Sequence, residues 1–375
     1  MIRIVIKIGS KVLTGKDNQL NKEVVSSLVK DIVKIKKEKN IDVILVTSGA
    51  VALGRSVNNL ENFKIESAAI KYNKSIVKEQ ILAAIGQPKL MAFYIAEFKK
   101  YGFTCAQLLA TRAVFADREA YLSLRTVTEN LLKLNIIPIF NENDVLSPEE
   151  LDFSDNDQLS SMIASMVVAD KLILLSDVDG VYKNLSNESK TVVKEISNAH
   201  DYMEKVDDCG SLGKGGMKSK LLTADIVTSL GITMQIANGQ EKEVVSRIIG
   251  GENIGTVFPA KNKKTKALKS WLMTSAVSQG KIYVNSCLAE VLKKKQTCSI
   301  LFLGITKVEG NFKNNEVVEI CDDNGIVFGK GLARFGKREL TKRIALYNKL
   351  NDVEKRKVKA AEIVAVHYDY FSFVG

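Results

Sequence analysis

The chain has 375 residues, and 46% of them are hydrophobic. A chain of this length exceeds what a single hydrophobic core usually organises, so two domains are expected. Residues 1–260 hold 32 basic and 32 acidic side chains, whereas residues 261–375 hold 22 and 11, so the whole net charge of +11 falls on the C-terminal part. This asymmetry predicts a domain boundary. It is compatible with an RNA-facing C-terminal domain and equally with an ordinary solvated basic surface.

Several classes of protein are disfavoured by composition. Arg3, Lys7 and Lys11 interrupt the N-terminus where a signal peptide would be apolar, and no run approaches the roughly 18 to 20 uncharged apolar residues of a membrane span, so a soluble cytoplasmic protein is expected. Five scattered cysteines without a CxxC pair argue against disulfides and zinc, and two histidines leave little material for a histidine base, so no protein metal site is predicted.

Short apolar runs alternate with amphipathic stretches over the first 260 residues. Strands are expected at 2–8, 42–47, 104–109, 136–140, 171–175 and 232–237, and helices at 21–39, 117–134, 158–169 and 217–230. This alternation predicts an α/β fold with an open, mostly parallel sheet sandwiched by helices, occupying residues 1–258.

The pattern changes after residue 258. A charged connector is expected at 259–279, followed by a small mostly-β domain at 280–375. Its short β-like runs lie at 281–284, 299–305, 316–320, 326–328 and 363–366.

The first two predicted strands each end in a glycine beside hydroxyl residues. Lys7-Ile8-Gly9-Ser10 would point an ammonium group and backbone donors into the crevice where open α/β sheets bind ligands. Thr47-Ser48-Gly49-Ala50 would let a helix N-terminus approach an anionic group. A solvated lysine and a tight turn are the alternatives, although a turn alone does not require Ser48.

Two polar clusters follow the fourth predicted strand. Asn141-Glu142-Asn143-Asp144 suits a ligand that carries both ammonium and carboxylate groups, because carboxylates accept from an amine and amides donate to an acid. A polar loop cap is the alternative. Asp155-Asn156-Asp157 begins the next helix, where one aspartate is expected to serve as the N-cap.

Two further segments suit a nucleotide. Ser176-Asp177 ends the fifth predicted strand and leads into a loop. The segment Lys214-Gly215-Gly216-Met217-Lys218-Ser219-Lys220 opens a helix, and its glycine pair and lysines are typical of a polyphosphate-binding segment. Alone this pattern is weak evidence for phosphate binding, but its place after the other strand-end clusters strengthens the prediction.

In this order, the segments KIGS, VTSGAVALG, NEND, DND, LLSDVDGVY and KGGMKSK resemble the glutamate 5-kinases of the amino acid kinase family over essentially the whole chain. The C-terminal part resembles the PUA domain that many of them carry. Aspartokinases typically begin with a KFGG-type segment, and acetylglutamate kinases have a glycine pair in place of Gly9-Ser10. The resemblance therefore favours the glutamate 5-kinases.

The resemblance implies an activity and its cofactors. ATP, with Mg²⁺, would phosphorylate the side-chain carboxylate of L-glutamate to give L-glutamyl 5-phosphate, the first step of proline biosynthesis. Such a carboxylate, with a pKa near 4.3, needs no general base, which agrees with the scarcity of histidine. The implied partners are a second copy of the chain in a homo-oligomer, glutamyl phosphate reductase as recipient of the product, and RNA at the PUA-like domain.

The resemblance also implies roles for individual residues. Lys7 would stabilise the transferring phosphoryl group, Lys220 the charge on the departing ADP, and Asp157 would orient both lysines. Glutamate contacts would come from Ser48, Asp144 and Asn156. The implied ATP contacts are Lys7, Ser176, Asp177, Lys214, Gly215, Gly216, Met217, Lys218, Ser219 and Lys220.

The chain departs from the family pattern at two places. Ser154 stands where a glycine is usual, and Lys214 and Lys218 make the glycine-pair loop more basic than the usual threonine-led version. Two other functions stay open: a sibling kinase acting on a different acid or a phosphate, and an RNA-binding protein with a vestigial kinase domain. The retained set of Lys7, Asp157 and Lys220 speaks against the second.

Overall fold

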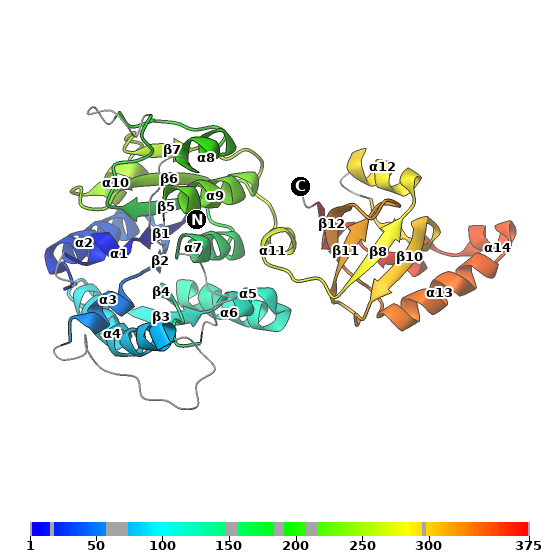
Figure 1. The fold of residues 1–375 in the computed structure, drawn as a ribbon, viewed down its shortest axis with the longest axis horizontal. Helices are drawn as coiled ribbons and strands as arrows, with labels where there is room; N and C mark the ends of the chain where they lie inside the picture. Colours follow the sequence, from blue (N-terminus) through cyan, green and yellow to red (C-terminus); the bar gives the residue numbers. More distant parts are fainter. Residues whose placement is uncertain are drawn as a thin grey trace. The chain divides into compact units, whose positions relative to one another are not determined.

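The computed structural model describes residues 2–15, 19–57, 74–146, 156–183, 191–207, 216–294 and 298–373. The chain forms two compact units, whose elements are labelled in Figure 1. The first unit comprises Met1–Phe115 and Glu119–Thr265, and the second comprises Ala116–Arg118 and Lys266–Gly375.

A seven-stranded sheet forms the centre of the first unit, in the order β3-β4-β2-β1-β5-β6-β7. Neighbouring strands are parallel except β6 and β7. The strands are β1 (Arg3–Ile8), β2 (Asp42–Val46), β3 (Cys105–Ala110), β4 (Ile137–Glu142), β5 (Lys171–Ser176), β6 (Thr233–Asn238) and β7 (Thr256–Phe258). All six predicted strands are confirmed within two residues of their bounds. At three residues, β7 is too short to show a recognisable pattern.

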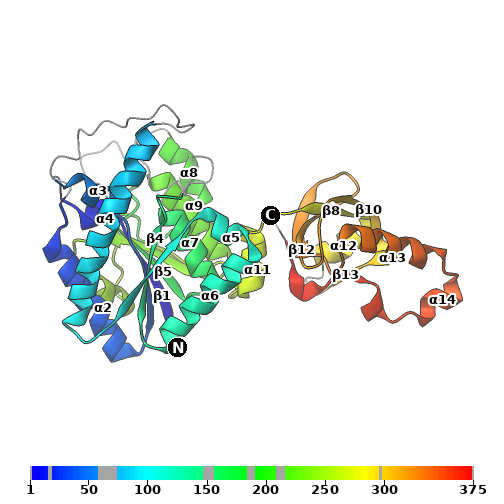
Figure 2. The same ribbon diagram turned by 90° about the horizontal axis from the view of Figure 1, so that it is seen from below.

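Helices cover both faces of this sheet, as Figure 2 shows. In Figure 2, one layer contains α2 (Lys22–Lys39) and α4 (Lys74–Lys99), and the other contains α6 (Arg118–Lys133), α7 (Asn156–Met166) and α9 (Met217–Ser229). Helix α10 (Val244–Ile249) packs against α2. The four predicted helices correspond to α2, α6, α7 and α9. Shorter helices make further connections: α1 (Ser10–Leu13), α3 (Ala50–Arg55), α5 (Arg112–Ala116) and α8 (His200–Asp207).

The largest element missed from the sequence is α4. Pro88 lies inside it, and a proline normally argues against a continuous helix. Between Ser75 and Lys99 it is also the one helix, within the described part of the chain, whose length and composition would suit a membrane span. Leu90, Tyr94 and Phe98 are nevertheless fully buried in the core of the first unit. Its apolar surface is therefore used, at least in this half, for packing inside the protein.

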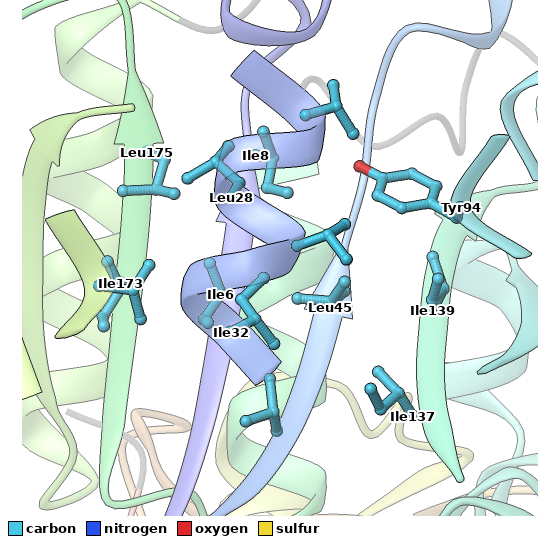
Figure 3. Packing of buried hydrophobic residues seen from close by; sticks show 14 of the residues in the cluster. Ile6, Ile8, Leu28, Ile32, Leu45, Tyr94, Ile137, Ile139, Ile173 and Leu175 are labelled. Atoms are coloured by element: carbon cyan, nitrogen blue, oxygen red, sulfur yellow. The ribbon is translucent and has the colours of Figure 1, made fainter. Parts of the chain in front are cut away.

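Side chains along β1 point alternately to the two faces of the sheet, toward the hydrophobic core on one face and toward the predicted site on the other. Ile6 and Ile8 belong to a hydrophobic cluster with α2 residues such as Leu28 and Ile32, shown in Figure 3. Because successive side chains in a strand point to opposite faces, Lys7 points to the other layer, which contains α7. A buried lysine thus faces the helix that begins with the Asn156-Asp157 pair.

The second unit contains a five-stranded sheet, in the order β10-β8-β11-β12-β14, and a two-stranded sheet of β13 and β9. The strands are β8 (Gly280–Val284), β9 (Ile300–Leu301), β10 (Ile305–Gly310), β11 (Val317–Cys321), β12 (Val327–Leu332), β13 (Val364–Val366) and β14 (Phe371–Phe373). Four helices were not expected here: α11 (Ala267–Thr274), α12 (Ser286–Lys294), α13 (Lys337–Lys349) and α14 (Asp352–Lys357). A separate core of buried residues, including Ile282, Ile320 and Phe371, holds this unit together.

Helix α11 lies within the expected connector. Trp271 and Leu272 are buried, and the helix packs against β12 and β14. This segment groups with the second unit from Lys266 onward. The boundaries at 258 and 280 stay predictions.

Candidate functional site

The carboxyl ends of four adjacent parallel strands, β4, β2, β1 and β5, meet at one edge of the first unit's sheet. Main-chain bonds join the segments that follow them: Gly9 N–H donates to Leu175 O at 2.9 Å, and Thr47 N–H donates to Phe140 O at 2.9 Å. A Cβ on Gly9 would lie 3.2 Å from Leu175 O, so glycine permits the close approach of the β1 and β5 ends. Open α/β sheets bind their ligands at such edges.

An ion cluster lies at this edge. Asp157, in the first turn of α7, is completely buried, and its Oδ1 lies 2.6 Å from Lys7 Nζ. Lys220 Nζ, from the first turn of α9, donates to Asp157 Oδ2 at 3.1 Å. The two lysine side chains are only 6% and 8% exposed. The three residues predicted to be catalytic therefore come together from three distant parts of the chain.

The charge balance of this cluster favours an anion. Two ammonium groups and one carboxylate carry a net positive charge, and charges held away from water are costly unless they are paired. Asp157 contacts both lysines and so holds their ammonium groups close to each other. A phosphate group would complete the balance.

A set of amide and hydroxyl groups lies at the β2 and β4 ends. Asn156 Nδ2 donates to Ser48 Oγ at 2.8 Å, to Thr47 O at 3.1 Å and to Asn141 Oδ1 at 3.3 Å. Asp144 is half-buried and follows β4 by two residues. The structure thus brings the predicted contacts Ser48 and Asn156 together and places Asp144 after the same strand that supplies Asn141.

Ser176 and Asp177 occupy the β5 end. Ser176 is buried and its hydroxyl donates to Asp177 Oδ1 at 3.2 Å, while Lys11 Nζ lies 3.1 Å from Asp177 Oδ2. Burial by itself would raise the pKa of Asp177, but the hydrogen bonds from Lys11, from a backbone N–H and from Ser176 hold it below its usual value. The carboxylate is therefore ionised at neutral pH.

The N-terminus of α9 begins after a glycine that has no side chain to cap it. Gly216 is the N-cap residue in an extended conformation and supplies no side-chain cap. The first N–H groups of a helix have no partner within the helix, and together with the dipole they attract anions. Met217 and Ser219 are half-buried, Lys218 is exposed and Lys220 is buried. The predicted contacts Lys214 and Gly215, and also Ser154 and Asp155, lie outside the described residues.

Two members of the site, Asn141 and Gln87, had no individual role in the sequence analysis, although Asn141 lay in a predicted ligand-binding cluster. Asn141 is buried, and its Nδ2 donates to Gln87 Oε1 at 2.6 Å. Its place at the head of a polar cluster after an apolar strand was a usable signal. Gln87 carried no signal, because it lies on α4, which was not predicted.

Comparisons with known proteins assign the chain to a family. The model of the amino acid kinase family matches residues 3–238, and the PUA domain model matches residues 280–349. A glutamate 5-kinase from Chlorobaculum tepidum is 38% identical over 336 residues, covering 88% of this chain and 90% of that protein. A glutamate 5-kinase from Bacteroides thetaiotaomicron is 33% identical over 373 residues, covering 98% and 97%.

Among solved structures, the UMP kinase from Bacillus anthracis aligns with 69% of this chain and 96% of its own, at 17% identity and a TM-score of 0.48. The family match and the two relatives carry the assignment without it. The chain belongs to the amino acid kinase family, within which its relatives over nearly the whole length are glutamate 5-kinases, and it carries a C-terminal PUA domain.

Proposed function

We propose that this protein transfers the γ-phosphoryl group of ATP to the side-chain carboxylate of L-glutamate. The product is L-glutamyl 5-phosphate, and the reaction is the first step of proline biosynthesis. The observation that carries the proposal is the buried Lys7–Asp157–Lys220 cluster, which contributes net positive charge at the ligand-binding edge of the sheet.

Each residue of the cluster has a role in the transfer. A carboxylate oxygen of glutamate forms a bond to the γ-phosphorus as the bond to the β–γ bridging oxygen breaks and ADP departs. Charge spreads over the phosphoryl oxygens in the transition state, so positioning and electrostatic stabilisation do most of the work. Lys7 stabilises the transferring group, Lys220 stabilises the ADP side, and Asp157 keeps both ammonium groups in place.

Substrate contacts come from the residues around the cluster. Ser48, Asp144 and Asn156 bind glutamate, supported by the hydrogen bond between Asn156 and Ser48 at the β2 end. Ser176, Asp177 and the start of α9 bind ATP, supported by the N-terminus of α9, whose N-cap residue Gly216 supplies no side-chain cap. Lys214 and Gly215 belong to the same proposed nucleotide set.

Mg²⁺ accompanies ATP in this proposal. Among the residues that the structure describes, no group of three or more His, Cys, Asp or Glu side chains is arranged to hold a metal ion. The lysine-rich donor set at the site suits phosphate more than a bare cation. The ion would therefore be held chiefly by the phosphate oxygens of ATP, whose charge it neutralises in part.

The remaining parts of the proposal concern partners and location. Glutamyl phosphate is a labile acyl phosphate, which favours direct transfer to glutamyl phosphate reductase. The enzyme is proposed to be a cytoplasmic homo-oligomer. The PUA domain, in the basic C-terminal part of the chain, is proposed to bind RNA through backbone phosphates, in which case about 6 to 10 contacts would lose roughly 10³ to 10⁵ in affinity between about 50 and 200 mM salt.

Trapping of the acyl phosphate tests the reaction. The purified protein, ATP and Mg²⁺ are incubated with hydroxylamine and with glutamate, aspartate or N-acetylglutamate in turn. Hydroxamate formation with glutamate alone is expected. Hydroxamate with aspartate or N-acetylglutamate instead would assign the chain to a sibling kinase, and ATP hydrolysis without any hydroxamate would contradict carboxylate phosphorylation.

A further inference from the structure

A chain of amide groups runs from α4 through β4 to α7. Gln87 Oε1 accepts from Asn141 Nδ2 at 2.6 Å, and Asn141 Oδ1 accepts from Asn156 Nδ2 at 3.3 Å. Asn156 Nδ2 in turn donates to Ser48 Oγ at 2.8 Å. Two of these residues, Asn156 and Ser48, are the proposed glutamate contacts, whereas Gln87 lies on a helix with no assigned part in the reaction.

Two main-chain groups determine which way each amide in this series of hydrogen bonds is turned. The Glu142 N–H can only donate, and it donates to Asn141 Oδ1 at 2.9 Å, so Asn141 must turn its NH₂ group toward Gln87. Gln87 must then present its oxygen. At the other end, the Thr47 carbonyl can only accept, and it accepts from Asn156 Nδ2 at 3.1 Å. The orientation of each amide therefore follows from its neighbours.

Close helix packing holds Gln87 at this place. Its neighbour Gly86 packs against the first turn of α3, where a Cβ would overlap the carbonyl oxygen of Ala50 and would lie 2.6 Å from Gly54 N. Ala50 follows Ser48 by two residues. The α3–α4 crossing thus holds Gln87 beside the segment that carries Ser48.

The position of the Asn156 amide depends on where Asn141 lies, because three acceptors surround an NH₂ group that has only two protons. Two protons are shared among Thr47 O, Ser48 Oγ and Asn141 Oδ1, all within 3.3 Å of Nδ2. A shift of the Asn141 amide would redistribute these bonds. Such a shift would also move the groups that meet the substrate.

We propose that Gln87 is a positioning residue for the amino-acid acceptor, acting through Asn141 on Asn156 and Ser48. This inference rests on the proposed phosphorylation of glutamate. The buried Gln87 Nε2 has no hydrogen-bond partner within the described residues, and a buried donor of this kind is costly. Compared with an apolar residue of similar size, Gln87 contributes a side-chain oxygen, and this oxygen orients Asn141.

The test compares Gln87→Met, which keeps the side-chain length and removes the acceptor, with the wild type in the hydroxamate assay. The expected result is a rise of about 3- to 10-fold in the KM for glutamate, the range produced by losing one neutral hydrogen bond. The KM for ATP should not change. Lys89→Met, an exposed position on the same helix, is the matched control and should match the wild type in both values.

A double-mutant cycle with Asn156→Ala separates positioning from general destabilisation. If Gln87 acts through the amide chain, adding Gln87→Met to Asn156→Ala should raise the KM for glutamate no further. The glutamate-induced rise in Tm gives an independent reading on folded protein, and should be smaller for Gln87→Met than for Lys89→Met.

The possible outcomes are distinct. Equal rises in both KM values, additive effects in the cycle, or a Gln87→Met variant indistinguishable from Lys89→Met would each overturn the inference while leaving the proposed function intact. A wild type that forms no hydroxamate and shows no glutamate-induced rise in Tm would overturn the proposed function itself, and this inference with it.

Discussion

Both units of the molecule contain pairs of lysine and carboxylate side chains, and the two sets differ in burial. In the first unit, Lys7 and Asp157 meet at 2.6 Å with side chains 6% and 0% exposed. In the second unit, Lys307 and Glu309 meet at 2.5 Å with side chains 62% and 40% exposed. The nitrogen–oxygen distances of the two pairs are nearly the same. The pairs therefore differ in the dielectric that surrounds them and not in their geometry.

Glu309 also belongs to a row of half-buried charged side chains whose sign alternates across a sheet. Glu309 lies opposite Lys281, Lys281 opposite Glu319, and Glu319 opposite Lys330, on neighbouring strands β10, β8, β11 and β12. Opposite charges at facing positions support the strand register and keep this face soluble. Such pairs contribute little to stability, whereas buried charges are costly to maintain and are concentrated at functional sites.

The largest effect is expected at the buried cluster. Lys7→Met or Lys220→Met removes a charge that meets the developing phosphoryl charge, and should lower kcat by about 10² to 10³. The measurement is steady-state hydroxamate formation, with circular dichroism to establish folding. Lys30→Met, an exposed lysine on α2, is the control. Near-normal kcat in a folded Lys7→Met variant would remove Lys7 from the mechanism.

A smaller and more selective effect is expected at the β4 end. Asp144→Ala should raise the KM for glutamate by about 10- to 100-fold, the range for a hydrogen bond to a charged group, with little change in the KM for ATP. Asn143→Ala is the control, because Asn143 donates its backbone N–H to Ala110 O at 3.0 Å and the substitution keeps this bond. The reverse pattern would move Asp144 to the nucleotide side.

Separation of the units should have little effect on the chemistry. Lys261 N–H donates to Thr228 O at 3.0 Å and Thr265 N–H donates to Leu230 O at 2.9 Å, so residues 261–265 are tied to the end of α9. A chain ending at Thr265 should fold and keep kcat within about 2-fold, since domains usually keep their own cores. A chain ending near Ala260 loses both bonds and should have a lower Tm. A folded but inactive 1–265 chain would contradict catalytic independence.

The smallest effect is expected at Glu309, in the alternating row of the second unit. Glu309→Gln should leave kcat and both KM values unchanged. Hydrogen bonds from Lys307 and Tyr283 lower the pKa of Glu309 below its usual 4.5, so its contribution to stability is present above that value and is lost as the pH falls through the lowered pKa. The difference in Tm between wild type and variant should therefore be small at pH 7 and vanish in acid. A difference that persists below the lowered pKa would contradict this assignment.

The sequence by itself determined much of the first unit. Periods of 2 and 3.6 residues are local properties, and they identified six strands and four helices whose bounds the structure confirms closely. The polar segments after successive strands indicated the ligand-binding edge, because parallel strands deliver their carboxyl ends to one edge. The resemblance to the amino acid kinase family then singled out Lys7, Asp157 and Lys220 within these segments. No local pattern revealed β7, and the proline within α4 obscured that helix.

Only the tertiary structure decided which polar groups meet. The contact of Asp157 with two lysines depends on the packing of α7 against both β1 and α9, which no spacing along the chain encodes. Gln87 reaches Asn141 because Gly54 on α3 and Gly86 on α4 let these helices cross closely, although the two amide residues are 54 positions apart. Side-chain hydrogen bonds of this kind depend on sub-ångström placement of separate elements, so they follow from packing and not from local sequence pattern.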